Sequence, residues 1–209
     1  MATAPGREPG PAAILIGPPG AGKTTIGRRL ARALRVEFLD VDEEIERREG
    51  RSIPQIFAGD GEPAFRAIEE HVVADVVAHH PGVVSLGGGA VLSETTRSLL
   101  RRHQVVYLEL TEEEGIRRTV NPAASNRPLL KGDDPAAAYR ALMARRTPIY
   151  RELATIRVST VGRAPSSVVR RSAGARSPAL GDAATGAWLR PRPSFSARRD
   201  GGCRWAVLP

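Results

Sequence analysis

The stretch Gly17 to Thr24 reads GPPGAGKT and matches the motif G-x-x-x-x-G-K-[ST] at every fixed position. It follows an apolar run at residues 12–16, AAILI, and leads into a segment with a helical pattern that begins at Lys23. Between a strand and a helix, such a loop wraps an anionic phosphate with its backbone N–H groups. A glycine-rich turn without a nucleotide is the alternative, but it does not explain the flanking strand and helix.

The motif also assigns roles within this P-loop. Lys23 reaches the β and γ phosphates of a nucleotide and is predicted to be catalytic, and the Thr24 hydroxyl can ligate Mg²⁺. The predicted nucleotide-binding residues of the loop are Gly20, Ala21, Gly22, Lys23, Thr24 and Thr25.

Length and composition limit the class of protein. The 209 residues suffice for one α/β domain with a full core and an appendage. The single cysteine, Cys203, excludes a disulfide framework and a cysteine metal site, and it favours a reducing compartment. Residues 1–11 lack the apolar region of a signal peptide, and no run of about 18 apolar residues follows. We expect a cytoplasmic protein that does not associate with a membrane.

The formal net charge of +8 would ordinarily suggest a nucleic-acid partner. Residues 170–209 hold eight arginines against Asp182 and Asp200, so this stretch carries +6 and residues 1–169 carry only +2. A solvated basic tail therefore explains the charge better than a basic groove across the folded body. We expect no nucleic-acid partner.

The body of the chain alternates short apolar runs with helical patterns. This order is typical of an α/β fold with a parallel sheet covered by helices on both faces. In such sheets, ligands collect at the carboxyl ends of the strands. The five expected strands are residues 12–16, 36–39, 83–86, 104–110 and 155–160, and the expected helices include residues 23–34, residues 42–48, a long stretch through His71 and a segment near Glu112.

Two stretches are irregular. Residues 121–134, NPAASNRPLLKGDD, surround an arginine with turn-forming residues, which suits a mobile lid at about 120–134. From about Arg170 the sequence has no sustained period and is dense in Gly, Pro, Ser and Arg, so we expect a disordered tail. A shifted reading frame and a natural extension are both compatible with it. The expected organisation is a disordered start at 1–11, a P-loop domain at 12–171 and the basic tail at 172–209.

Further segments follow the P-loop in a characteristic order. They are LDVD at 39–42, GEPAFRAIEE at 61–70, SLGGGA at 85–90, NRPLL at 126–130 and RRTPIYRELA at 145–154. Over about residues 13–169 the chain thus resembles the shikimate kinase family. The resemblance implies a P-loop kinase fold with a lid, ATP and Mg²⁺ as cofactors, and phosphorylation of the 3-hydroxyl of shikimate in the route to chorismate and the aromatic amino acids.

Asp40 and Asp42 are expected to end the second strand and to do separate jobs there, one near Mg²⁺ and the other on the substrate hydroxyl. The resemblance gives Asp42 to the acceptor hydroxyls, as a catalytic and substrate-binding residue. It gives Asp40, with Thr24, to the magnesium ion. The alternative for Asp42 is a helix N-cap before Glu43.

Shikimate carries a carboxylate, which a planar guanidinium holds through paired hydrogen bonds. The resemblance implies Arg66 and Arg146 for this contact. Glu69, three residues after Arg66 on an expected helix, can hold Arg66 in place, whereas a solvated surface position is the alternative. The other implied substrate contacts are Gly87, Gly88 and Gly89, whose backbone can approach the ring closely, although an ordinary turn also explains three glycines.

Arg127 is the implied lid arginine and a catalytic residue, because it brings positive charge to the migrating phosphoryl group. Arg118 and Arg163 match positions that pack around adenine, so with Arg127 they complete the implied nucleotide contacts. The last helix begins near Ser166 and is expected to be truncated near Arg170. The sequence gives no oligomer signal, so we expect a monomer.

Two other functions stay open. In the first alternative, the protein is a kinase whose acceptor is gluconate or a nucleotide. A small carboxylated polyol suits Arg66, Arg146 and the three glycines better than a nucleotide does. In the second, the basic tail binds nucleic acid and the P-loop acts as a switch. Truncation at Val169 separates this second function from catalysis.

Overall fold

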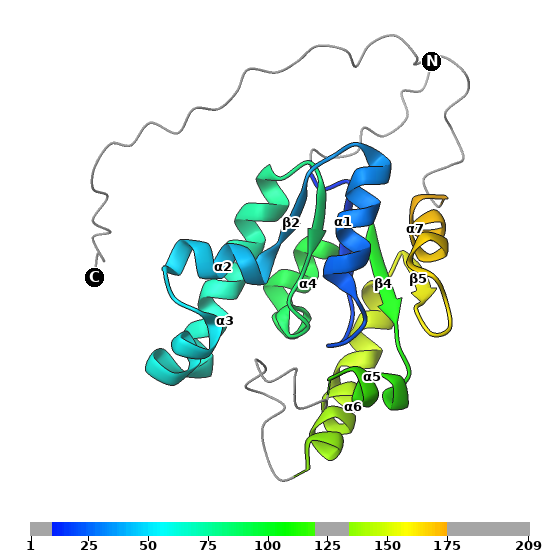
Figure 1. The fold of residues 1–209 in the computed structure, drawn as a ribbon. Helices are drawn as coiled ribbons and strands as arrows, with labels where there is room; N and C mark the ends of the chain where they lie inside the picture. Colours follow the sequence, from blue (N-terminus) through cyan, green and yellow to red (C-terminus); the bar gives the residue numbers. More distant parts are fainter. Residues whose placement is uncertain (1–9, 120–133, 175–209) are drawn as a thin grey trace. The chain divides into compact units, whose positions relative to one another are not determined.

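Within the described residues, five strands lie parallel in one sheet, in the order β2-β3-β1-β4-β5 (Figure 1). The computed structural model describes residues 10–119 and 134–174. The strands are β1 (Ala13–Ile16), β2 (Phe38–Asp40), β3 (Val83–Ser85), β4 (Val105–Glu109) and β5 (Ile156–Ser159). Between and after them come α1 (Lys23–Leu34), α2 (Val41–Glu49), α3 (Ile53–His79), the 3-10 turn η1 (Ala90–Leu92), α4 (Glu94–Leu100), α5 (Glu112–Thr119), α6 (Pro135–Leu153) and α7 (Pro165–Gly174). The predicted α/β fold with a five-stranded parallel sheet is confirmed.

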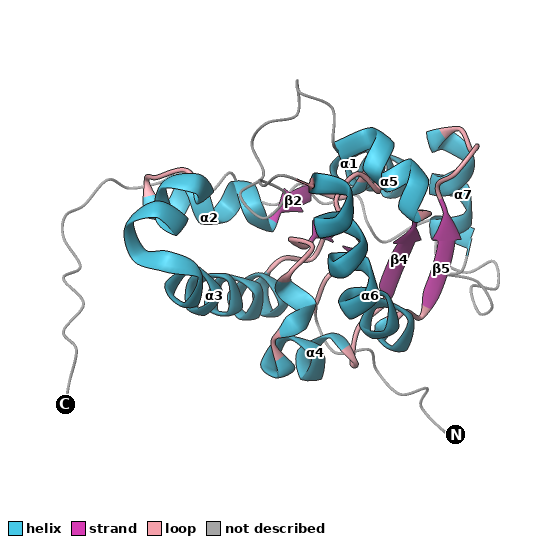
Figure 2. Ribbon diagram, turned by 90° about the horizontal axis from the view of Figure 1, so that it is seen from below, coloured by secondary structure: helices cyan, strands magenta, loops and turns pink. Residues whose placement is uncertain are grey.

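Side chains that alternate along β1 point into two different cores. Ala13 and Leu15 are buried with side chains of α1 and α7, whereas Ile14 and Ile16 are buried with side chains of α2, α3, α4 and α6. In Figure 2, α1 and α4 accordingly lie on opposite sides of the strands. A strand covered on both faces reads as a continuous apolar run, which is why AAILI shows no alternation.

The carboxyl ends of β1, β2 and β3 meet at one edge of the sheet. Leu15 in β1 and Asp40 in β2 both pair with Ser85 in β3. The P-loop leaves β1 at this edge, α2 follows β2 directly, and the glycines 87–89 come just after β3. The fold therefore brings together motifs that lie far apart in the sequence.

The second strand ends two residues before Asp42, which was expected from the sequence to lie at its end. Asp40 is the last residue of β2, and Asp42 lies in the first turn of α2. The expectation that both aspartates end a strand is wrong. Asp40 Oδ1 accepts a hydrogen bond from the backbone N–H of Asp42 at 3.1 Å, so Asp40 is the N-cap of α2 and Asp42 is not.

Two helices show local features that matter for the site. Gly61 interrupts α3 with φ 82° and ψ 171°, and Pro63 follows, so the helix is kinked before it reaches Arg66. α7 continues to Gly174, beyond the expected truncation near Arg170, and it buries Val168 in the core shared with α1. The described residues all belong to one compact unit, Met1–Arg176. None of the helices in the two described ranges is long and apolar enough to span a membrane.

Candidate active site

The P-loop turns at glycines on its way from β1 to α1. Gly17, Gly20 and Gly22 have φ values of 147°, 82° and 82°, a region that residues with a Cβ atom rarely adopt. A Cβ atom at Gly17 would also lie 2.7 Å from the carbonyl oxygen of Leu108. The glycines therefore fix the path of the loop, which presents backbone N–H groups at the N-terminus of α1.

Lys23 and Thr24 open α1 and face different partners. Lys23 Nζ donates to the carbonyl oxygens of Gly17 at 2.9 Å and Pro18 at 3.2 Å, so its ammonium group lies over the P-loop. Thr24 Oγ1 donates to Asp40 Oδ2 at 2.8 Å. The two residues predicted to face the metal, Thr24 and Asp40, thus lie together beside the loop. No cluster of three or more His, Cys, Asp or Glu side chains within residues 10–119 and 134–174 could hold a metal ion.

A cavity of about 490 Å³ lies next to Lys23. Part of its wall is apolar and includes Phe57 and Phe65, whose ring centroids are 4.6 Å apart. The polar part of the wall comes from α2, α3, the glycine segment and α6. All the residues predicted to bind the acceptor line this cavity, namely Asp42, Arg66, Gly87, Gly88, Gly89 and Arg146.

Asp42 lines the cavity and interacts electrostatically with Lys23 of the P-loop. Burial raises the pKa of Asp42 from 3.8 to about 6, Asp40 adds to the rise, and Lys23 opposes it. A carboxyl group with this pKa is mostly ionised at neutral pH and is a better proton acceptor than an ordinary aspartate.

Arg66 is held by two carboxylates of its own helix, α3. Its Nη1 donates to Glu69 Oε2 at 2.6 Å, and its Nη2 donates to Glu62 Oε1 at 2.9 Å. Glu69 is 3% exposed, and burial raises its pKa even though the guanidinium of Arg66 acts in the opposite direction. The predicted pairing of Arg66 with Glu69 is confirmed, and it fixes the direction of the guanidinium.

Each glycine after β3 lies against a different charged side chain. A Cβ atom at Gly87 would lie 2.6 Å from Asp42 Oδ1 and 2.7 Å from Glu69 Oε1. A Cβ atom at Gly88 would lie 3.5 Å from Arg146 Nη1, and one at Gly89 would collide with the guanidinium of Arg66. These glycines are therefore needed for space, because the groups predicted to bind the substrate occupy it.

Arg146 comes from the buried side of α6. It is 7% exposed, whereas its neighbour Arg145 is exposed. The hydroxyl of Tyr150, one turn further along α6, donates to the carbonyl oxygen of Gly88 at 2.5 Å. Burial raises the pKa of Tyr150 above its usual value, and the nearby Arg146 guanidinium partly offsets this. The helix thus supplies both a buried cation and a hydrogen bond to the glycine segment.

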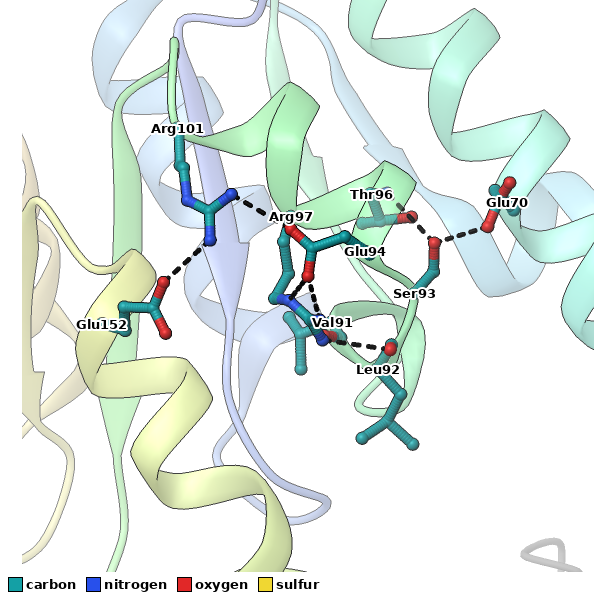
Figure 3. A network of polar contacts seen from close by, with 9 residues as sticks. All are labelled: Glu70, Val91, Leu92, Ser93, Glu94, Thr96, Arg97, Arg101 and Glu152. Atoms are coloured by element: carbon teal, nitrogen blue, oxygen red, sulfur yellow. Dashed lines mark hydrogen bonds and ion pairs between the residues drawn. The ribbon is translucent and has the colours of Figure 1, made fainter.

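A network of polar contacts holds the segment that follows the glycines (Figure 3). The Ser93 hydroxyl, at the start of α4, donates to Glu70 on α3. At the other end of α4, Arg101 Nη2 donates to Glu152 on α6 at 2.9 Å. η1 and α4 are thereby tied to the two helices that carry Arg66 and Arg146.

The three arginines predicted to bind the nucleotide lie in different places. Arg118 Nη1 donates to the carbonyl oxygen of Gly20 at 3.2 Å, which places it against the P-loop. Arg163 is exposed in the turn between β5 and α7. Arg127 and the expected lid lie outside the described residues, except for Asp134.

The sequence did not predict a role for two tyrosines of the site. Tyr139 donates to the carbonyl oxygen of Pro19 in the P-loop at 3.1 Å, and Tyr150 donates to Gly88 as described above. Both tyrosines lie on α6, and Tyr150 stands within the RRTPIYRELA segment. Their spacing from Arg146, seven and four residues, was the signal that they share its buried face.

Known proteins match this arrangement over most of the chain. A family model described as shikimate kinase matches residues 19–174. The chain is 60% identical over 159 residues to the shikimate kinase of Rhodococcus erythropolis, across 76% of this chain and 93% of that relative. It is 58% identical over 160 residues to the shikimate kinase of Mycobacterium tuberculosis, across 77% of this chain and 90% of that relative.

A solved structure shares the fold as well. The shikimate kinase from Acinetobacter baumannii in complex with shikimate has a TM-score of 0.73 and 39% identity, and the match covers 78% of this chain and 90% of that one. Together with the family model and the sequence relatives, this match shows that the chain belongs to the shikimate kinase family.

Proposed function

We propose that the cavity binds shikimate and that the γ-phosphoryl group of ATP, bound at the P-loop, is transferred to its 3-hydroxyl to give shikimate 3-phosphate and ADP. The observation that carries this proposal is the pair Arg66 and Arg146, which reach one cavity from two helices while Lys23 lies at its P-loop side. Two guanidinium groups suit a small carboxylated acceptor. The matched structure from Acinetobacter baumannii is of a complex with shikimate, which supports this acceptor.

Arg66 and Arg146 bind the shikimate carboxylate in this proposal. Glu69 orients Arg66, and the Tyr150 hydroxyl forms a hydrogen bond with Arg146, so both guanidinium groups are positioned before the substrate arrives. Preorganised groups of this kind lower the entropic cost of binding. The backbone of Gly87, Gly88 and Gly89 lies against the ring and its hydroxyls.

Asp42 accepts the hydrogen bond of the attacking hydroxyl and takes its proton. Its raised pKa and its place in the wall of the cavity that Lys23 also lines suit this role. Lys23 stabilises the charge that develops on the transferred group, since phosphoryl transfer needs alignment and positive charge more than covalent chemistry. Arg127, in the segment beyond the described residues, adds to this charge.

The residues beside the P-loop fit a magnesium ion. Mg²⁺ prefers oxygen ligands, and it is commonly held by one or two protein oxygens together with substrate phosphates. The Thr24 hydroxyl gives its hydrogen to Asp40, so the lone pairs of Thr24 Oγ1 stay available for the ion, and Asp40 acts through Thr24 and through water. When bound, the ion neutralises charge on the β and γ phosphates.

The remaining nucleotide contacts come from the P-loop backbone and from two arginines. Gly20, Ala21, Gly22 and Thr25 surround the phosphates at the start of α1. Arg118, which already contacts the loop, and Arg163, in the turn after β5, flank the adenine. These contacts, with the lid at about 120–134, complete the proposed ATP site.

The domain organisation is also a proposal. We infer that residues 12–171, with the end of α7, contain the whole active enzyme and that the basic tail is dispensable, because α7 completes the core beside α1. Truncation after residue 176 should leave the kcat of the kinase unchanged, and it should abolish any binding to polyanions. We also propose that the protein is a monomer, and light scattering on the full-length chain and on the chain truncated after residue 176 tests this.

One assay tests the proposed function directly. ADP release is followed in a coupled assay with ATP, Mg²⁺ and one of three acceptors: shikimate, gluconate or AMP. Turnover with shikimate alone supports the proposal. Turnover with gluconate or AMP at a higher kcat/KM would assign the cavity to another acceptor.

A further inference from the structure

One face of α6 carries three buried polar side chains. Tyr139, Arg146 and Tyr150 are separated by seven and four residues, so all three point to the same side of the helix. The two tyrosines are fully buried, and Arg146 is 7% exposed. Only Arg146 of these three lines the cavity, so the hydroxyl groups of the tyrosines serve something other than direct contact with the acceptor.

Tyr150 makes a single short contact with the glycine segment. Its hydroxyl donates to the carbonyl oxygen of Gly88 at 2.5 Å, and its ring stacks on Tyr107 with centroids 5.2 Å apart. The ring is therefore fixed from one side while the hydroxyl holds the backbone on the other. Gly88 has no side chain of its own to hold it in place against Arg146.

Tyr139 makes the corresponding contact with the P-loop. Its hydroxyl donates to the carbonyl oxygen of Pro19 at 3.1 Å, three turns of helix before Tyr150. Gly115 on α5 leaves room for this side chain, since a Cβ atom at Gly115 would overlap the tyrosine hydroxyl and ring. The tyrosine thus reaches the P-loop through a gap that α5 leaves open.

The two loops that the tyrosines hold are themselves neighbours. A Cβ atom at Gly88 would lie 3.5 Å from both the carbonyl oxygen of Gly17 and the Cδ atom of Pro19. The P-loop carries the proposed nucleotide site, and its Pro19 also lines the acceptor cavity beside the glycine segment. A small displacement of either carbonyl would therefore change the distance between the two substrates.

We propose that Tyr139 and Tyr150 are positioning residues that fix the two loops from one helix, Tyr139 for the nucleotide and Tyr150 for the carboxylated acceptor. The inference rests on the proposed function, and it adds that different residues of α6 serve the two substrates. Neither tyrosine touches a substrate. Tyr139 acts through the carbonyl of Pro19, whereas Tyr150 acts through the carbonyl of Gly88 and through the side chain of Arg146, with which its hydroxyl also forms a hydrogen bond. The loss of either tyrosine should therefore affect the binding of one substrate and spare the other.

The test uses the three tyrosines of the chain, each replaced by phenylalanine. Tyr150→Phe should raise the KM for shikimate about tenfold and leave the KM for ATP within about twofold, because the buried hydroxyl that contacts Gly88 and Arg146 is lost. Tyr139→Phe should do the reverse. Tyr107→Phe is the matched control: it removes a hydroxyl from the same aromatic stack without touching either loop, so both KM values should stay unchanged.

Calorimetric titration of each variant with shikimate and with ADP·Mg²⁺ gives a second readout that is independent of turnover. A variant of position 150 with 4-aminophenylalanine keeps a donor, and it should restore shikimate affinity whether or not the phenylalanine variant folds. Equal losses for both substrates in both variants, or no loss in either, would overturn the inference while wild-type turnover with shikimate keeps the proposed function intact. A wild type that fails to bind shikimate would overturn both.

Discussion

The proposed nucleotide side and the proposed acceptor side of the active site are built in different ways. The P-loop is eight consecutive residues, and its binding groups are mainly backbone N–H groups at the start of α1. The acceptor cavity is lined by side chains of α2, α3 and α6 and by the glycine segment after β3. One side is local in sequence, and the other exists only after the sheet has formed.

This difference has a physical consequence. A backbone cradle tolerates many side chains as long as its glycines and its lysine are present. A cavity made of separate side chains depends on each partner that orients them, as Glu69 orients Arg66 and as Tyr150 holds Gly88. Substitutions on the acceptor side should therefore have graded effects on shikimate, whereas the lysine of the P-loop should be indispensable.

The largest effect is expected at Lys23. Lys23→Ala removes the cation that lies over the P-loop and should lower kcat by at least about 10³-fold, because charge on the transferred group is then unbalanced. The coupled ADP-release assay measures this loss, and an unchanged melting temperature shows that the fold is intact. Substantial residual turnover with normal ATP dependence would show that the loop lysine is not part of the chemistry.

Arg146 should show the next largest effect, confined to the acceptor. Arg146→Lys replaces a planar fork with a point charge and should weaken shikimate binding by about 10²-fold while ATP binding is unchanged. Arg145→Lys is the matched control, since Arg145 is the exposed neighbour on the same helix. Calorimetry with each ligand distinguishes them, and equal losses for shikimate and ATP would mean that Arg146 serves both sides.

Glu69 tests whether an orienting carboxylate matters. Glu69→Gln keeps the size of the side chain but removes the charge that holds Arg66, so the KM for shikimate should rise about tenfold. Glu62→Gln removes the other carboxylate that contacts Arg66. Because the Glu62 side chain is half exposed, this substitution should change the KM for shikimate by less than about twofold. A similar KM for the two variants would refute the orienting role of Glu69.

A substitution away from both sides gives the smallest effect. Hydrogen bonds and charge from Arg47 and Arg48 lower the pKa of Glu44 on α2 from 4.5 to about 2. Because the folded-state pKa is depressed, this contribution to stability is fully present above pH 4.5 and is lost as the pH falls toward 2. Glu44→Gln should therefore cost about 1 kcal/mol of unfolding free energy at pH 6, since surface pairs contribute little.

Urea unfolding at pH 6 and at pH 3 measures this difference. The difference in unfolding free energy between wild type and Glu44→Gln should be smaller at pH 3 than at pH 6, and shikimate binding at neutral pH should be the same for both. A gap that widens at pH 3 would contradict the assigned direction of the pKa shift.

The sequence predicted the fold well because the apolar strands and the P-loop are local signals. The residues that it predicted for the acceptor through resemblance all line one cavity, and their role in binding stays a prediction. It misplaced Asp42, because a strand that ends at Asp40 and a helix that starts at Val41 leave no loop between them to mark the boundary. It missed Tyr139 and Tyr150, because a tyrosine that donates to a distant carbonyl leaves no local pattern apart from its place on a helix face.

The missing side chain at Gly87 limits how this enzyme can be altered. A methyl group there would collide with carboxylate oxygens of both Asp42 and Glu69, which belong to different helices. Alanine is one base change away from any glycine codon, so random mutagenesis will keep producing this variant, and each time it displaces two carboxylates of the proposed acceptor site at once. A library designed to broaden the range of acceptors should therefore leave position 87 untouched and vary the apolar wall at Phe57 and Leu142.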